Sequence, residues 1–119
     1  MIKTLILIAL ILVPQLSCAC SGIRFTEKWI EPITNSDGTP LTDLAKTTLY
    51  YQVNTSTPVK KDYPAKLLTG GATKTVSFTP IMNCKTQTNT VKKWVTATDT
   101  KGYESTIYDL GTVTIPIIK

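Results

Sequence analysis

The side chains of this sequence that could do chemistry are eight carboxylates, three thiols and nine aromatic rings, and the chain contains no histidine. Without an imidazole, neither a Ser-His-Asp nor a Cys-His arrangement can form. Asp37 and Asp43 share one predicted loop and would suit a glycosidase pair or, with nearby carbonyl groups, a calcium site. The simpler interpretation of both residues is turn capping. We therefore expect a protein that is not an enzyme and that holds no metal or cofactor.

The three thiols belong to Cys18, Cys20 and Cys84. Three cysteines at these spacings match no zinc-ligand pattern. Cys18 and Cys20 follow an apolar segment and are candidates for lipidation, because bacterial lipoproteins carry their lipid on a cysteine at the end of the signal. For Cys84 the simpler expectation is a lone buried thiol. The alternative is a disulfide between Cys84 and Cys20.

The first 19 residues have the order of an export signal. Lys3 gives a basic start, and Leu5–Val13 is an unbroken run of nine apolar residues that ends at a proline before several small residues. A membrane-spanning helix needs about 20 apolar residues, so a signal peptide over residues 1–19 is the better interpretation. In one interpretation an ordinary signal peptidase cuts before Cys20. In the lipoprotein alternative the cut comes before the cysteine that takes the lipid, Cys20 or Cys18. We expect an extracytoplasmic protein, secreted or anchored to the cell envelope.

The predicted mature chain, residues 20–119, is long enough for one domain with one modest core. Loss of Lys3 leaves 12 basic and 8 acidic residues, so its net charge is +4. The lysines are scattered rather than clustered with aromatic residues, which disfavours a specific nucleic-acid partner. Weak attraction to anionic headgroups or cell-wall polymers is compatible with this charge.

Short runs rich in Val, Ile, Thr and Tyr alternate with turn residues after residue 20, and no segment has helical periodicity. This pattern predicts an all-β domain of about seven strands. We expect strands at 22–30, 47–53, 66–68, 74–79, 91–98 and 110–117, with a connection or ragged edge strand at 54–64. The alternation predicts these core residues: Trp29, Leu49, Tyr51, Phe78, Val95 and Ala97.

The same alternation leaves several side chains for contacts with a partner. Tyr50 and Trp94 point away from the core in the predicted register, and an exposed Trp can anchor a partner. A register shifted by one residue would instead bury Trp94. Tyr103 and Lys101 lie in a predicted turn at 99–104, and the simpler interpretation of Tyr103 is a plain turn residue.

Two segments resemble the fibronectin type III domains of bacteria and phages. WIEPITNSDGTPLTDLAKTTLYYQV, residues 29–53, resembles the second and third strands, and WVTATDTKGYES, residues 94–105, resembles the sixth strand and the turn after it. The resemblance covers about a third of the chain. It implies an immunoglobulin-like β-sandwich in which Trp29 fills the space between the sheets. It also implies a positive φ at Gly102 and a turn capped by Asp99.

The chain departs from this family in ways that predict further features. Lys93 occupies an inward position that is usually apolar, so its head snorkels outward or the strand carries a bulge. Glu27 is a second flaw, because it shares the face of Trp29. Only eight residues separate Cys20 from Trp29, so the first strand is missing or truncated. In this fold we expect the chain start and the Cys84 loop at opposite poles, which argues against the disulfide because bridged Cα atoms lie within about 7 Å.

A missing first strand would leave the second strand unpaired, and unpaired edges recruit other strands. We therefore expect self-association through a sheet edge or capture of a strand from a partner. Loops at one pole and exposed sheet faces recognise partners in this family, and the matching pole here would carry residues 34–44 and 99–104. The resemblance therefore makes Asp37 a partner-binding candidate beside Tyr103, Lys101, Trp94 and Tyr50.

The predicted function is that of a non-catalytic binding or adhesion module at a bacterial cell surface, with or without a lipid anchor. One alternative is a structural component of a phage virion or cell envelope. Another is an accessory carbohydrate-binding module in which Tyr103 or Trp94 stacks on sugar. The expected partner is a protein or a surface polymer such as a glycan, and the membrane is contacted only through the signal peptide or a lipid anchor.

Overall fold

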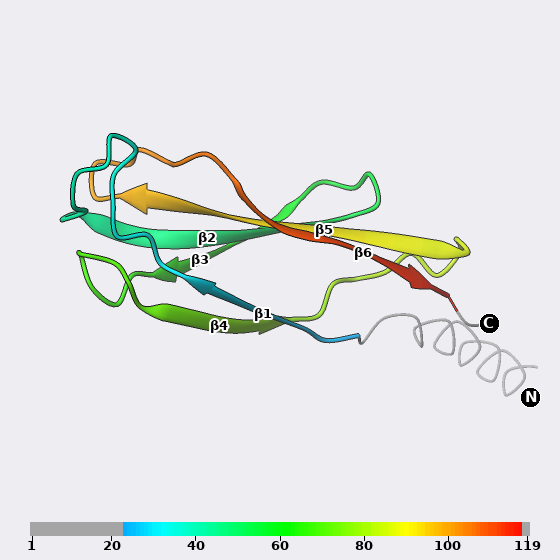
Figure 1. The fold of residues 1–119 in the computed structure, drawn as a ribbon. Coiled ribbons are helices and arrows are strands. Elements are labelled where there is room, and N and C mark those ends of the chain that lie inside the picture. The colour runs from blue at the N-terminus through cyan, green and yellow to red at the C-terminus, as the bar shows by residue number, and fades with distance from the viewer. Residues whose placement is uncertain (1–22, 118–119) are drawn as a thin grey trace, which may run out of the picture.

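Six strands in two antiparallel sheets make up the protein in a computed structural model that describes residues 23–117 (Figure 1). The smaller sheet pairs two strands, and the larger has the order β3-β2-β5-β6. No helix occurs within residues 23–117, so the all-β prediction is confirmed. The strands are β1 (Phe25–Ile30), β2 (Leu44–Val53), β3 (Val59–Pro64), β4 (Thr73–Phe78), β5 (Thr88–Asp99) and β6 (Tyr108–Pro116).

The segment between β2 and β4 differs most from the prediction. Residues 59–64 form a regular edge strand paired with β2, whereas the expected strand at 66–68 is a turn. The turn is required because Gly70 has φ +73° and packs against the Pro32 carbonyl, where a Cβ would lie 1.7 Å from the oxygen. The part of the chain that the structure describes therefore has six strands, and the expectation of about seven is wrong.

The core lies between the two sheets. Trp29, Leu49, Tyr51, Phe78 and Val95 are buried there as predicted. Ala97 is only half-buried, so its assignment to the core is wrong; it lies near the end of β5, where the sandwich opens. The alternation also places Val91 on the face of Val95, and Val91 is buried. The sequence pattern missed three buried apolar side chains, namely Leu41, Leu44 and Met82.

The two apparent flaws in the inward pattern are partners of one another. Lys93 Nζ on β5 donates to Glu27 Oε1 on β1, and the side chains are only 7% and 14% exposed. The Lys93 ammonium also lies 5.5 Å from the centre of the Phe25 ring. The expectation that Lys93 snorkels outward is therefore wrong, while the expected irregularity is present as a register shift after Lys93 in its pairing with β6.

The chain enters β1 at the same pole as the connection that contains Cys84. Phe25 at the start of β1 pairs with Phe78 at the end of β4, and residues 79–87 follow directly. The expectation of opposite poles is wrong for the described residues, because antiparallel pairing of β1 with β4 places the start of β1 beside the end of β4.

Cys84 is disulfide-bonded, so the expectation of a lone thiol is wrong as well. Cys18 and Cys20, the only other cysteines in the sequence, lie outside the described residues, as does the predicted signal peptide at 1–19. Within the described range, no helix has the length and apolar character needed to cross a membrane.

The buried side chain of Glu31 lowers the stability of this fold. It continues the inward-facing alternation of Glu27 and Trp29, is 1% exposed, and neither carboxylate oxygen has a hydrogen-bond partner among the described residues. Its backbone is held by bonds to Ala72 and Gly71, so the local chain path fixes the side chain inside. Burial of a polar group without a partner destabilises the folded state.

We expect a Glu31→Met variant to raise the free energy of unfolding by about 1–3 kcal/mol, because an apolar side chain of similar length removes the unsatisfied oxygens. Urea unfolding would measure the change. Glu31→Gln, which keeps unpartnered polar atoms, should gain less. A loss of stability in Glu31→Met would instead mean that the carboxylate has a stabilising partner.

Candidate functional site

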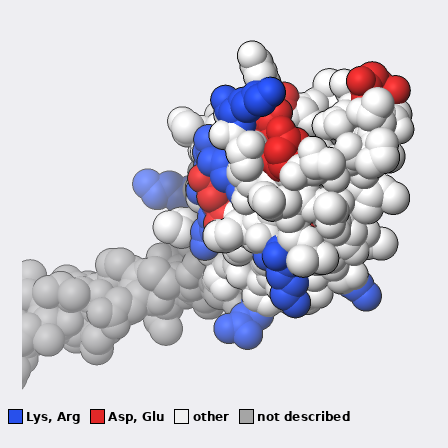
Figure 2. Space-filling model, turned by 90° about the vertical axis from the view of Figure 1, so that its left-hand side faces the viewer, with Lys and Arg blue, Asp and Glu red and all other residues white. Residues whose placement is uncertain are grey.

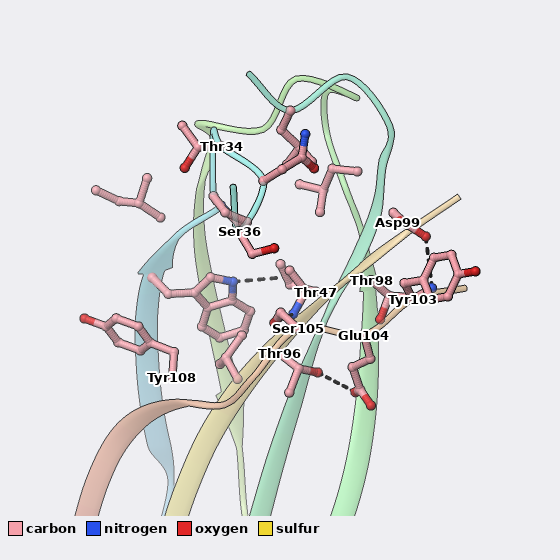
Figure 3. A pocket seen from close by; sticks show the side chains of 18 of the residues that line it. Thr34, Ser36, Thr47, Thr96, Thr98, Asp99, Tyr103, Glu104, Ser105 and Tyr108 are labelled. Carbon is pink, nitrogen blue, oxygen red and sulfur yellow. Dashed lines mark hydrogen bonds between the residues drawn. The ribbon is translucent and has the colours of Figure 1, made fainter. Parts of the chain in front are cut away.

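A cleft opens between β1 and the segment that leads into β6. Its volume is about 700 Å³, within the range of ligand-binding pockets. Figure 3 shows Thr34 and Ser36 toward one end of the cleft, Tyr108 toward the other, and Thr47 and Ser105 between them. This opening is called the β1 cleft from here on, and it is larger than the second pocket, which lies between residues 53–56 and 81–83.

The floor of the β1 cleft consists of core side chains that the sandwich leaves uncovered on this side. Trp29, Leu41, Leu44 and Val95 all line it. The Trp29 indole nitrogen donates a 3.2 Å hydrogen bond to the Thr47 hydroxyl, which fixes the ring in the floor (Figure 3). The floor is therefore rigid and mostly apolar, as in sites that bury part of a ligand.

The cleft is open because strand pairing is incomplete on both of its sides. β1 pairs only with β4 among the described residues. On the other side, regular pairing of β5 with β6 reaches only Val95↔Tyr108, and the chain before Tyr108 forms a turn and an isolated bridge. Neither sheet therefore covers the interior at this edge.

One end of the cleft is formed by the turn that follows β1. Asp37 Oδ1 accepts bonds from the Thr39 amide (3.0 Å) and hydroxyl (2.6 Å), which lower the pKa of this carboxyl. Asp37 thus caps a turn, as the simpler interpretation expected. No group of three or more His, Cys, Asp or Glu side chains that could hold a metal ion occurs among residues 23–117.

The turn after β5 forms the opposite lip. Asp99 Oδ1 accepts 2.9 Å bonds from the amides of Lys101 and Tyr103, and Gly102 has φ +93°, so the predicted turn is confirmed. Tyr103 lines the cleft and is 74% exposed. Lys101 is exposed but does not line it. Of the predicted partner-binding residues, Tyr103 alone lines the β1 cleft.

Tyr50 and Trp94 lie on the outer face of the larger sheet, separated from the cleft. Their rings stack with centroids 5.4 Å apart and planes at 5°. Neighbouring Lys93 and Val95 are buried, so the predicted outward register is confirmed and a buried Trp94 is wrong. Lys60 lies over the Tyr50 ring and Lys92 over the Trp94 ring, at 5.9 and 5.6 Å. Each lysine therefore lies over an aromatic ring on which a bound sugar would have to stack.

Glu104 fastens the turn after β5 to this outer face. Its Oε2 accepts 2.6 Å bonds from the hydroxyls of Thr96 and Tyr50, and the bond to Thr96 is drawn in Figure 3. These bonds, the Thr96 bond first, lower the pKa of the Glu104 carboxyl. The bond to Glu104, with burial, raises the pKa of the Tyr50 phenol. One carboxylate thus positions the exposed lip of the cleft.

These shifts predict how stability depends on pH. Ionised Glu104 contributes stability that is present above the ordinary carboxyl pKa of 4.5 and is lost as pH falls through its lower folded value. Neutral Tyr50 contributes stability that is present below its ordinary pKa of 10.0 and is lost as pH rises through its higher folded value. We expect Glu104→Gln to reduce the acid-induced loss of unfolding free energy, measured in urea between pH 7 and pH 3. An unchanged pH profile in this variant would contradict the role of Glu104.

Sequence reasoning named part of the cleft, since both loops of the predicted recognition pole, 34–44 and 99–104, contribute residues to its lining. It missed Lys28, Ser105 and Tyr108, each of which looks like an ordinary strand or loop residue in the sequence. The short distance from Cys20 to Trp29, which predicted a missing first strand, pointed to an opening at this edge. The cleft depends on which segments lie opposite β1, and local patterns do not contain this information.

The pole at one end of the cleft carries a broad uncharged area. Figure 2 views the molecule from this pole and shows this area with basic and acidic side chains around its margin. Large apolar side chains are exposed in the connections at this pole, among them Ile33, Leu67 and Leu68. Exposed apolar surface of this kind is typical of interaction sites.

No family model matches this chain, and no curated protein or solved structure matches it.

Proposed function

We propose that this chain is an exported, non-catalytic binding module with a fibronectin type III-like fold, acting at a bacterial cell surface. The observation that carries the proposal is the β1 cleft, a preformed and mostly apolar opening beside a strand that has a partner on only one side among the described residues. Such an opening suits binding to another macromolecule.

The strand order supports this fold type. If β1 corresponds to the second immunoglobulin strand, β1 and β4 are strands B and E of one sheet, and β2, β5 and β6 are strands C, F and G of the other. β3 then extends the second sheet beyond strand C. The strand absent from this correspondence is the first, which would lie beside β1 at the cleft.

The disulfide of Cys84 supports export, because such bonds persist mainly in oxidising compartments. It also restricts the lipid anchor, since a cysteine in a disulfide cannot carry a lipid on its sulfur. An intrachain partner of Cys84 is Cys18 or Cys20, because the sequence holds no other cysteine. Lipidation of Cys20 would remove Cys18 with the signal and leave Cys84 without such a partner. We therefore propose that the mature chain is either unlipidated from Cys20 onward or lipidated on Cys18.

Mass spectrometry of the mature protein tests export and anchoring together. The full chain would be expressed in a bacterial host, purified from the envelope and extracellular fractions, and analysed without reduction. We expect a chain that begins at Cys20 or at lipidated Cys18, with Cys84 in a disulfide. Uncleaved protein confined to the cytoplasm with reduced Cys84 would overturn the proposal.

Binding is tested with fluorescently labelled protein on isolated bacterial envelopes. Saturable binding is expected, and digestion of the envelopes with protease or with glycan hydrolases separates a protein partner from a glycan. The accessory carbohydrate-binding alternative predicts that Trp94→Ala or Tyr103→Ala abolishes binding. The contacts of Lys60 and Lys92 with the Tyr50–Trp94 pair give this alternative less support.

A further inference from the structure

The edge of β1 differs from the other strand edges of the described domain. β3 carries three consecutive charged residues, Lys60 to Asp62. The Lys74 ammonium on β4 donates to the backbone at the end of β3, and β6 ends in a proline. Charges and prolines of this kind block pairing with other chains. β1 offers one charged residue on its outward face, Lys28, between Thr26 and Ile30.

β1 is also the edge that borders an opening into the core. A strand placed beside β1 would pair with the main-chain groups of this edge that have no strand partner among residues 23–117. Every second side chain of that strand would point between the sheets, toward Trp29, Leu44 and Val95 in the floor of the cleft. Part of the rim of the opening is apolar as well, since Ile30 and Tyr108 line it and are 70% and 67% exposed. The cleft thus has the two parts of a strand-binding site, a main-chain edge and apolar side-chain pockets.

Resting on the proposed function, we infer that the β1 cleft binds an extended segment of a partner protein, which takes the place that the first strand has in the proposed fold. The segment has apolar side chains at alternate positions, directed into the cleft. Between two of them it has an acidic side chain that faces outward opposite Lys28.

The charge of the occupant follows from Lys28. This lysine lines the cleft and has no ion-pair or hydrogen-bond partner among the described residues. Opposite charges on directly facing strand positions stabilise pairing. The carboxylates on the far lip are already engaged, Asp99 by two amides and Glu104 by two hydroxyls. An acidic residue is therefore favoured on the outward face of the bound strand, next to β1.

A second folded copy is a poorer occupant. Two β1 edges could pair with one another, but the inward side chains of each β1, Phe25 and Trp29, already pack in their own core. A second β1 would lengthen the smaller sheet and leave the cleft empty. A segment that is not part of a folded sheet can pair with the edge and fill the cleft as well.

Peptide binding to the full chain tests this inference. The probe is a fluorescein-labelled peptide, Thr-Val-Thr-Val-Glu-Val-Thr-Val-Thr, and the control is a peptide of the same composition with its four valines consecutive. Fluorescence anisotropy should give saturable binding of the alternating peptide with a Kd below about 1 mM and at least tenfold weaker binding of the control. Absence of saturable binding up to that concentration would overturn the inference.

Matched variants locate the binding site. Ser36 lines the cleft, whereas Thr57 is exposed near the opposite pole. We expect Ser36→Trp to weaken binding at least tenfold, and Thr57→Trp to leave it unchanged. Lys28→Glu should weaken the Glu peptide about two- to fivefold and favour a peptide with Lys in place of Glu. Because Lys28 is exposed, this exchange also tests the site if Ser36→Trp fails to fold. Equal binding by all variants would contradict the inference.

Two further results would show that something other than a partner segment occupies the β1 cleft. Hydrogen exchange that shows the outer β1 amides protected before peptide is added would mean that another part of the chain fills the edge. A dimer in analytical ultracentrifugation that Ser36→Trp abolishes would identify a second copy. Neither result bears on export, and loss of peptide binding with retained envelope binding would leave the proposed function standing.

Discussion

A Glu27→Ala variant is expected to lose about 3–5 kcal/mol of unfolding free energy, because it leaves the Lys93 ammonium buried without its partner. Lys93 is 7% exposed in its side chain and lies between the sheets, so water cannot replace the carboxylate. The loss is a large part of the stability of a domain of this size. Chemical denaturation monitored by tryptophan fluorescence or circular dichroism would measure it.

Replacement of both partners separates the cost of an orphaned charge from the value of the pair. The double variant Glu27→Leu with Lys93→Met keeps similar volumes without buried charge. Its stability should equal or exceed that of the original protein, because apolar replacement of a buried ion pair is often neutral or favourable. A double variant as unstable as Glu27→Ala would show that the pair itself stabilises the fold. In that case the two sheets would depend on a specific ionic contact.

A Trp29→Ala variant is expected to lose about 3–5 kcal/mol, since it removes the largest side chain between the sheets and leaves a cavity. Trp29 is 7% exposed, packs edge-on against Tyr63 and donates to the Thr47 hydroxyl. Trp29→Phe should recover much of this loss but not the hydrogen bond to Thr47. Thermal and urea unfolding would give both values.

Trp94→Ala is the matched control, because it removes the other tryptophan from the same sandwich. Trp94 is half-buried on the outer face and stacks on Tyr50, so the expected loss is about 1–2 kcal/mol. A loss in Trp94→Ala that exceeds the loss in Trp29→Ala would contradict the assignment of the two faces. The comparison therefore tests the register of β5 as well as the core.

The all-β class, most strand positions and most of the core were predictable from the sequence. Alternation of apolar and polar residues marks strand faces directly, because successive side chains point to opposite sides. That rule placed Trp29, Leu49 and Val95 inside and Trp94 outside, as the structure has them. Turn chemistry is equally local, and the capping roles of Asp37 and Asp99 followed from the residue types.

The partners of side chains that interrupt a strand pattern could not be predicted from the sequence. Glu27 and Lys93 each looked like an error in a strand pattern, and only the packing of β1 on β5 makes them partners. The state of Cys84 likewise depended on which pole the chain enters. Contacts between residues far apart in the chain leave no periodic trace, so alternation within one strand cannot reveal them.

The β1 cleft likewise depends partly on the sequence alone and partly on the tertiary structure. The sequence by itself determined that only eight residues separate Cys20 from Trp29, a spacing that predicts a missing or truncated first strand. The tertiary structure decided that the resulting gap lies beside Trp29, Leu44 and Val95, with Lys28 at its edge. A missing strand can be counted along a chain, but the shape and chemistry of the space it leaves are set by the side chains that other strands bring around it.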